Sequence, residues 1–165
     1  MLNGVIEIGD EGSKLLVART APTLKNSKYV DVVKDGMNGI AVLRIPEEFN
    51  LVIHSASGDP NKEDIREHSL SLVDRLVEQT LEFGAEPVAF ANVVDSRTGD
   101  IQMLETIAGA LVEKAHKYKI AILNGENAIL GERINGEANI SGTMIGILPK
   151  EELGVGRYGA KHLEW

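Results

Sequence analysis

The stretch LEFGAEPVAF, residues 81–90, joins the end of an apolar-striped helix to the start of a buried strand. Gly84 stands where a helix end needs a residue that tolerates a left-handed backbone. Pro87 cannot continue a helix and directs Glu86 toward an extended conformation. The apolar run over 88–94 is typical of a strand that is buried on both faces. The stretch therefore predicts a helix, a sharp end and a buried strand in succession.

Two helices flank this strand in the sequence. The first is expected from about residue 63 to 83, since its leucines and valines recur at helical spacing and its first turn is acidic. The second follows the loop at 95–100 and ends near the basic residues 117–119. Its periodicity is the clearest in the chain, with apolar residues at Ile101, Leu104, Ile107, Ala108, Leu111, Val112 and Ala115.

The remaining chain reads as strands, loops and an irregular start. Residues 1–37 show the least regular pattern, with a short helix or strand expected at 14–19. Apolar runs bounded by turn formers predict strands at 40–45, 51–56, 87–94, 120–123 and 139–148. The first two of these strands are expected to pair as a hairpin across the turn that begins at Pro46.

The expected fold is therefore α/β with a mixed β-sheet and two main helices on one face, in the order ββαβαββ. Strand–helix–strand units imply parallel neighbours, and the hairpins add antiparallel pairs. Helices on one face leave the other face of an apolar sheet open. The simplest way to cover that face is another subunit or domain.

Composition limits the classes of function. The 165 residues suit one domain, and a net charge of -8 argues against broad binding to nucleic acid or to an anionic membrane. The chain has no cysteine, which removes thiol catalysis and fits a cytoplasmic protein. No signal peptide is expected at the first residues, and no apolar run is long enough to span a bilayer.

Two loops carry candidate site residues. The loop over residues 57–62, with Gly58, Asp59 and Lys62, follows a strand and opens a helix, which is a geometry that can hold phosphate. From residue types alone, an ordinary strand-to-helix connection with a proline turn is the favoured interpretation of this loop. Asn124, Gly125 and Glu126 follow a buried strand and could bind Mg²⁺ and a nucleotide, with a simple turn as the alternative.

The histidines do not predict a metal centre. His54 alternates along a strand and His68 lies on a helix, and neither has a second histidine or a carboxylate at metal-ligand spacing. His68 is expected to form a surface pair with Asp64, four residues earlier on the same helix.

An ordered set of motifs identifies a family. Gly84-Ala85-Glu86-Pro87, the strand ending in Gly125-Glu126, and the segment from Gly136 through Ser141-Gly142 to Pro149-Lys150 resemble the N-terminal domain of aminoimidazole ribonucleotide synthetase, also called phosphoribosylformylglycinamidine cyclo-ligase. The resemblance extends upstream to Gly4–Ile8, to the glycine-rich loop at 35–39 and to the turn at 46–49, so it covers most of residues 4–150.

The resemblance implies a domain at 1–150, a tail at 151–165, and a family C-terminal domain that these residues do not include. It implies ATP and Mg²⁺ as cofactors, and a homodimer in which two sheets meet to form a barrel. Nucleotide or phosphate binding would fall to Gly58, Asp59, Lys62, Asn124, Gly125 and Glu126. Metal ligation would fall to Glu78 and Glu126.

The sequence departs from the family pattern at two expected aspartates. Ser57 stands where the nucleotide loop begins with aspartate, and Gln79 stands where the helix before Gly84 carries a metal-binding aspartate. Two hypotheses follow. The chain is an ATP-binding protein related to the ATP-dependent cyclo-ligase of purine biosynthesis, or it is a non-catalytic dimeric module that binds a partner or ligand on the same scaffold.

Overall fold

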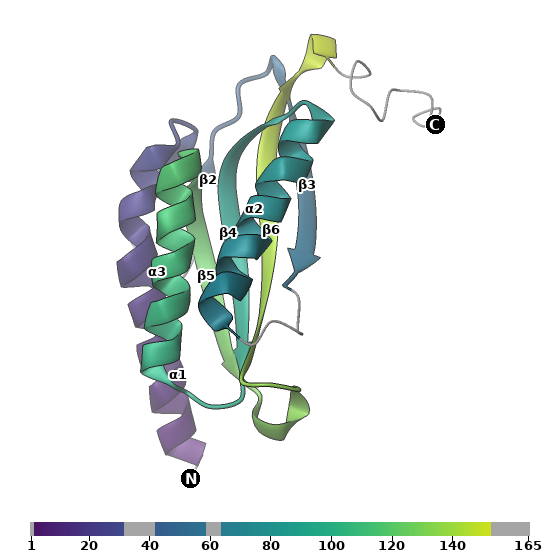
Figure 1. Ribbon diagram of the computed structural model, residues 1–165. Coiled ribbons are helices and arrows are strands. Elements are labelled where there is room, and N and C mark those ends of the chain that lie inside the picture. The colour runs from purple at the N-terminus through teal and green to yellow at the C-terminus, as the bar shows by residue number, and fades with distance from the viewer. Residues whose placement is uncertain (1, 32–41, 59–63, 153–165) are drawn as a thin grey trace.

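Three α-helices and a four-stranded sheet carry the fold in the computed structural model, which describes residues 2–31, 42–58 and 64–152 (Figure 1). The α-helices are α1 (Leu2–Thr20), α2 (Ile65–Phe83) and α3 (Ile101–Tyr118). The strands are β1 (Val30–Asp31), β2 (Val42–Leu43), β3 (Phe49–Ser57), β4 (Glu86–Ser96), β5 (Ala121–Ile129) and β6 (Ala138–Pro149). Short 3₁₀ turns lie at η1 (Ala21–Asn26), η3 (Gly131–Arg133) and η4 (Lys150–Glu152).

The sheet has the strand order β3-β6-β4-β5. The parallel pair expected across the second helix is confirmed, because β4 and β5 are parallel neighbours joined by α3. The expected hairpin before the first helix is wrong. β3 pairs with β6 over nine residue pairs, while β2 pairs with β1 in a separate two-stranded sheet. The antiparallel ladder with β6 gives every residue of β3 a partner across the strands, which the two-residue strand β2 could not do.

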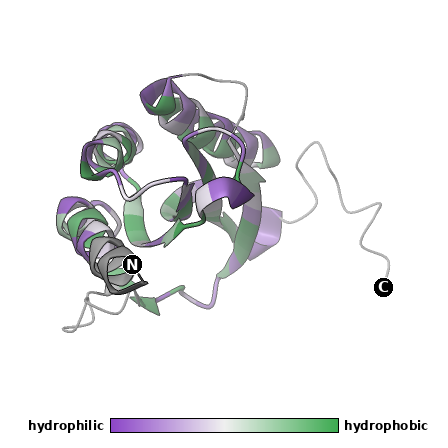
Figure 2. Ribbon diagram, turned by 90° about the horizontal axis from the view of Figure 1, so that it is seen from below, coloured by the Kyte–Doolittle hydropathy of each residue, from purple (hydrophilic) through white to green (hydrophobic). Residues whose placement is uncertain are grey.

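All three helices lie on one side of the four-stranded sheet (Figure 2). Their apolar stripes pack on the inward side chains of the strands, with Phe90, Met144 and Ile140 at the centre of the core. The mixed sheet with its helices on one face is therefore as expected, with a third helix added. The element order is also longer than expected, since a helix precedes the first strand.

The ends of α2 and α3 follow the residues that stand there. Asp64 and Asp100 cap the two helix starts, and each carboxylate accepts hydrogen bonds from the second and third amide groups of its helix. Gly84 ends α2 with a φ of 95°, as predicted for a left-handed cap. Pro87 then lies in β4, so the helix–strand joint at residues 81–90 is confirmed.

The N-terminal helix α1 corrects the expectation of an irregular start. Gly4, Gly9 and Gly12 interrupt its apolar pattern, and its described inward positions include Gly12 and Thr20 beside the single buried Leu16. Small and polar residues at inward positions weaken the periodic signal from which a helix is predicted. Contact with β5 and α3 stabilises this helix where its intrinsic preference does not.

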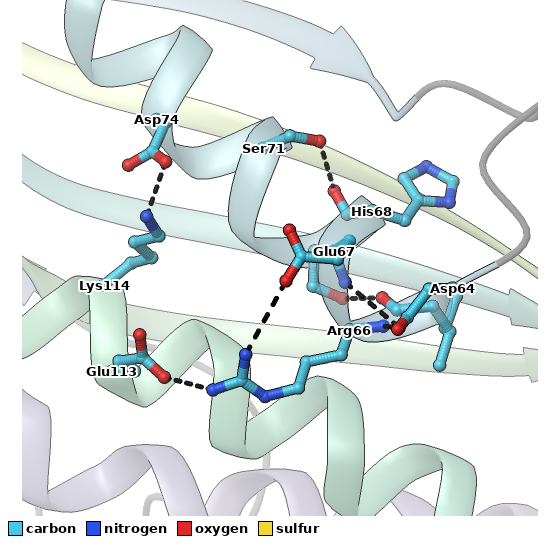
Figure 3. A network of polar contacts seen from close by, with 10 residues as sticks. Asp64, Arg66, Glu67, His68, Ser71, Asp74, Glu113 and Lys114 are labelled. Atoms are coloured by element: carbon cyan, nitrogen blue, oxygen red, sulfur yellow. Dashed lines mark hydrogen bonds and ion pairs between the residues drawn. The ribbon is translucent and has the colours of Figure 1, made fainter.

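A partly buried charge network joins α2 to α3 (Figure 3). The Lys114 ammonium lies 2.5 Å from one carboxylate oxygen of Asp74, and the Tyr118 hydroxyl donates to the other oxygen at 2.5 Å. Burial alone would raise the pKa of Asp74, but the hydrogen bonds from Lys114 and Tyr118, with the charges of Lys114 and Lys117, lower it overall. The carboxylate therefore stays ionised to lower pH in the folded chain than in the unfolded chain.

Asp74→Asn is expected to lower the free energy of unfolding at pH 7 by about 2 kcal/mol, because Lys114 would lose its partner in a mostly buried position. A lowered native pKa stabilises the fold above the ordinary value of 3.8, and this contribution disappears as the pH falls through the native pKa. The difference from wild type should therefore shrink in acid. Urea unfolding between pH 3 and 7 measures it, with Glu105→Gln, which removes an exposed pair, as a near-neutral control.

The side of the sheet away from the helices exposes large apolar side chains. Leu51 is 48% exposed, Ile53 57% and Val93 42%, and all three alternate with residues that point to the helices. The small sheet of β1 and β2 covers only one end of this open face, where Tyr29 packs with Phe49. No helix of the described segments is long and apolar enough to cross a membrane.

Candidate functional site

The predicted site residue Glu126 lies in one row across the open face with Ser57, the residue that stands in place of an expected aspartate. Ser57 pairs with Ser141, Ser141 with Val93, and Val93 with Glu126, from one edge strand to the other. Glu126 is exposed, and its carboxylate accepts only the amide of its neighbour Asn127, at 3.2 Å, among the contacts described for it. Three strand spacings of about 4.8 Å separate the ends of this row, so Ser57 and Glu126 lie about 14 Å apart.

The row carries hydroxyl groups toward β3. Ser57 and Ser141 place their hydroxyls 3.2 Å apart, and the next pair along the same two strands, Ser55 and Thr143, lies 2.8 Å apart. The open face is thus polar near the end of β3 and apolar toward Leu51. Ser57 stands where the resemblance implies an aspartate. An aspartate there would place a carboxylate beside these four hydroxyl groups, and serine supplies none.

Gly58 is fixed at the end of β3 by its surroundings. Its amide donates to the Ile140 carbonyl at 2.7 Å. The imidazole of His68 lies so close that a Cβ on Gly58 would stand 1.5 Å from Nε2 of His68. Only glycine therefore fits beside this ring. The other two residues proposed from this loop, Asp59 and Lys62, lie outside the described residues.

The start of α2 differs from the open anion site that the loop pattern suggested. The Asp64 carboxylate already accepts the amides of Arg66, at 2.8 Å, and Glu67, at 3.3 Å. A negative charge at this position occupies the positive end of the helix dipole. A phosphate at this loop would consequently depend on the loop backbone and on nearby cations more than on the first turn of the helix.

Two residues beside this loop were not found from the sequence. His68 is 1% exposed, so the expected surface pair with Asp64 is wrong; the ring turns toward the end of β3 instead (Figure 3). The sequence signal for a buried His68 was its spacing: Leu72 and Leu76 follow it by four and eight residues, so the three lie on one face of the helix. Arg75 donates from its guanidinium to the Ser57 carbonyl, and nothing in its position on an exposed helical face indicated this contact.

The segment Asn124-Gly125-Glu126-Asn127 is part of β5 and not the turn expected after a short strand. Its residues alternate across the sheet: Gly125 lies against Asn92 on the helix side, while Glu126 stands on the open face. Asn124 pairs with Ala91 at a break in the register of β4 and β5. Glycine and asparagine lower strand propensity, but the partner strand β4 overrides that preference.

The structure does not bring the two proposed metal ligands together. Glu78 and its neighbour Gln79 are exposed on α2, on the helix side of the sheet, whereas Glu126 is on the open face. Among the described residues, no group of three or more histidine, aspartate or glutamate side chains could hold a metal ion. The donor set of the described chain therefore does not by itself fit Mg²⁺, which requires several oxygen ligands.

His54 is a structural residue in this arrangement. Its Nε2 atom lies 2.7 Å from the Thr80 hydroxyl of α2. Burial lowers the pKa of His54, and a hydrogen bond to the Leu76 carbonyl opposes that shift in part. A neutral ring facing the helix is therefore favoured, and His54 takes no part in the row on the open face.

Sequence relatives match part of the chain, although no protein-family model does. Phosphoribosylformylglycinamidine cyclo-ligase from Thermococcus kodakarensis is 34% identical over 88 residues, which are 53% of this chain and 26% of the relative. The enzyme of the same name from Methanobrevibacter smithii is 27% identical over 145 residues, covering 83% of this chain and 42% of the relative. The chain thus spans less than half of the length of these relatives.

Solved structures share the fold. Thiamine-monophosphate kinase from Stenotrophomonas maltophilia superposes with a TM-score of 0.70 at 13% identity, covering 85% of this chain and 46% of that one. PurL from T. maritima, solved in complex with ATP, gives a TM-score of 0.55 at 23% identity, over 69% of this chain and 21% of that one. The chain is therefore homologous to phosphoribosylformylglycinamidine cyclo-ligases over part of their length, and it shares the fold of these two solved structures.

Proposed function

We propose that this chain is a nucleotide-binding domain that binds ATP at the end of β3. The observation that carries the proposal is the geometry at Gly58, where the buried imidazole of His68 packs against the end of β3, beside the row that runs from Ser57 to Glu126. The Arg75 guanidinium contacts the carbonyl of Ser57 just before this loop. A solved neighbour of the same fold is in complex with ATP, which supports a nucleotide as the ligand class.

In this proposal the loop holds the phosphates. Lys62 would neutralise phosphate charge, Gly58 would allow the backbone to approach, and Asp59 would contact the nucleotide or its cation. Glu126 would contact the distal part of the ligand from β5, in the row that ends at Ser57, whereas Gly125 faces the helix side of the sheet. Mg²⁺ would have to arrive with the nucleotide, because the described residues supply a single carboxylate in this row, on Glu126.

We further propose that the domain forms a homodimer through the open sheet face. The exposed Leu51, Ile53 and Val93 side chains are a strong reason for a partner on this face, because a monomer gains nothing from leaving them in water. A second copy would bring an identical apolar surface, and two such sheets would close into a barrel. The full ligase reaction, ATP-dependent ring closure as in the relatives, would need further residues from another domain or chain.

A non-catalytic dimeric module is the alternative, and two observations favour it. Ser57 and Gln79 replace the carboxylates that would hold Mg²⁺, and the Asp64 carboxylate occupies the helix start beside the loop. The chain still has Lys62 in this loop, and Arg75 contacts the Ser57 carbonyl just before it. ATP binding, measured directly, separates the two readings.

Lys62→Ala is expected to weaken ATP binding about tenfold, because one charged hydrogen bond to phosphate would be lost. Isothermal titration calorimetry with ATP, with and without Mg²⁺, measures the change. Lys150→Ala is the matched control, since Lys150 is exposed at the opposite end of β6. Equal affinities of the two variants would remove Lys62 from the site. No heat and no thermal shift of the wild-type chain at millimolar ATP would reject nucleotide binding by this chain alone.

A further inference from the structure

A groove lies where the C-terminal ends of α2 and α3 meet the segment that leads from η1 into β1. The two helices end side by side at the same end of the molecule (Figure 1). The groove has a volume of about 440 Å³, and small-molecule sites typically have about 300 to 1,000 Å³. Its lining includes Val77, Val88 and Tyr29, which are 1%, 2% and 8% exposed. The groove can therefore hold a small organic molecule against an apolar floor.

Two further side chains of the groove leave apolar surface available to a ligand. Leu81 follows Val77 by four residues on one face of α2, yet Leu81 is 56% exposed. Tyr118 lines the groove from the end of α3, and its hydroxyl donates to Asp74 at 2.5 Å, which orients the ring. Covering an exposed leucine beside an oriented aromatic ring releases water from apolar surface. A flat apolar group therefore suits this part of the groove.

Two lysines line the groove from different segments. Lys28 precedes β1, and its ammonium lies 5.0 Å from the centroid of the Tyr29 ring; Lys119 follows the last residue of α3. Within the described part of the chain, neither lysine forms an ion pair with a carboxylate. Glu86 is the single carboxylate among the described lining residues. In a chain with a net charge of -8, this local excess of positive charge favours an anion.

The backbone at Lys119 is a second indication of a role for its side chain. Lys119 ends α3 in the left-handed region, with φ 56° and ψ 34°, and among the described residues it is the only non-glycine with a positive φ. Helix α2 ends with Gly84, the residue that this conformation favours. A side chain in a left-handed conformation is strained, and such strain is found most often at functional sites.

We propose that this groove binds a small organic anion with a flat apolar body, such as an aromatic carboxylate. The body packs on Leu81, Tyr118 and the apolar floor, and the anionic group pairs with the ammonium groups of Lys28 and Lys119. The groove adjoins β4 at residues 86–88, whereas the row from Ser57 to Glu126 crosses β4 at Val93. The inference is therefore independent of nucleotide binding at the end of β3.

Benzoate and its neutral counterpart benzamide test the proposal on the full chain. In ¹H–¹⁵N NMR titrations, benzoate should give saturable shifts of the backbone amides of residues 26–29, 86, 88 and 118–119. Benzamide has nearly the same shape and no charge, so its dissociation constant should be at least about fivefold higher. The absence of saturable shifts at these residues with tens of millimolar benzoate would overturn the proposal, as would equal dissociation constants for the two compounds.

Lys119→Gly separates the role of the ammonium group from folding. Glycine suits the left-handed backbone, so the melting temperature should rise by about 2 °C. Benzoate should bind about fivefold more weakly, because one of the two ammonium groups is lost. A variant that binds benzoate as tightly as the wild-type chain does would exclude Lys119 from the site and overturn the proposal.

Lys28→Gln tests the second ammonium group, with Lys25→Gln as the matched control. Both changes remove one positive charge from an exposed lysine between α1 and β1, but only Lys28 lines the groove. Lys28→Gln should weaken benzoate binding about fivefold and Lys25→Gln less than about twofold. Equal effects of the two variants would show general attraction of the anion to positive charge, which would overturn the proposed site.

Discussion

Gly58→Ala is expected to destabilise the domain by about 3 kcal/mol, which is large for the addition of one methyl group. The new Cβ would stand 1.5 Å from Nε2 and 2.1 Å from Cδ2 of His68, a residue that is 1% exposed. Either the ring leaves its pocket or the end of β3 moves away from Ile140. Urea unfolding followed by circular dichroism measures the loss.

The double variant Gly58→Ala/His68→Ala identifies the imidazole as the cause. Removing the ring empties the space that the new methyl group needs, so the double variant should be more stable than the sum of the two single changes by at least about 1 kcal/mol. Gly109→Ala serves as the control and should stabilise the exposed helix by about 0.5 to 1 kcal/mol. Additive single changes would mean that Gly58 is required for another reason.

This contact also bears on the proposed phosphate loop. Because the imidazole fixes the backbone at Gly58, it sets the direction in which the chain leaves β3 toward the loop. A glycine in such a position reads from the sequence as a flexible loop residue. The structure gives it the opposite role, a close-packed residue that the neighbouring side chain makes rigid.

Local signals predicted much of the fold. Gly84, Pro87 and the apolar stripes of the two main helices act through contacts a few residues away, and the structure has the elements they indicate. Such local signals do not predict which strands pair when the strands are far apart in the sequence. β3 ends at Ser57 and joins β6, which begins only at Ala138, and the nearby β2 pairs with β1 instead.

The site was predictable only in part, for a related reason. Residues 57–58 and 124–126 were singled out from their positions after strands, and the sheet register places Ser57 and Glu126 in one row. The strand continues past Asn124, and its alternation decides on which face of the sheet each side chain lies. The sequence alone predicted a turn there. Glu78 and Glu126 were assigned to one metal site from the family resemblance alone, and the structure places them on opposite sides of the sheet.

Ile53→Asp is expected to convert a dimer into a monomer, with at least a hundredfold rise in the dissociation constant. Ile53 is 57% exposed on the open face, between the exposed Leu51 and the hydroxyl-bearing Ser55. In a dimer that buries this face, an aspartate at this position would lose its water and meet the apolar side chains of the second copy. Analytical ultracentrifugation at micromolar concentration measures the dissociation constant.

Leu81→Asp provides the matched control, because Leu81 is 56% exposed on α2, on the opposite side of the sheet. Both substitutions replace an exposed aliphatic side chain by the same carboxylate, so they change net charge equally and differ only in the face they alter. Dissociation by Ile53→Asp alone would place the second copy on the open face. A wild-type chain that sediments as a monomer at micromolar concentration would instead count against the barrel, and dissociation by Leu81→Asp alone would place the contact on the helix side.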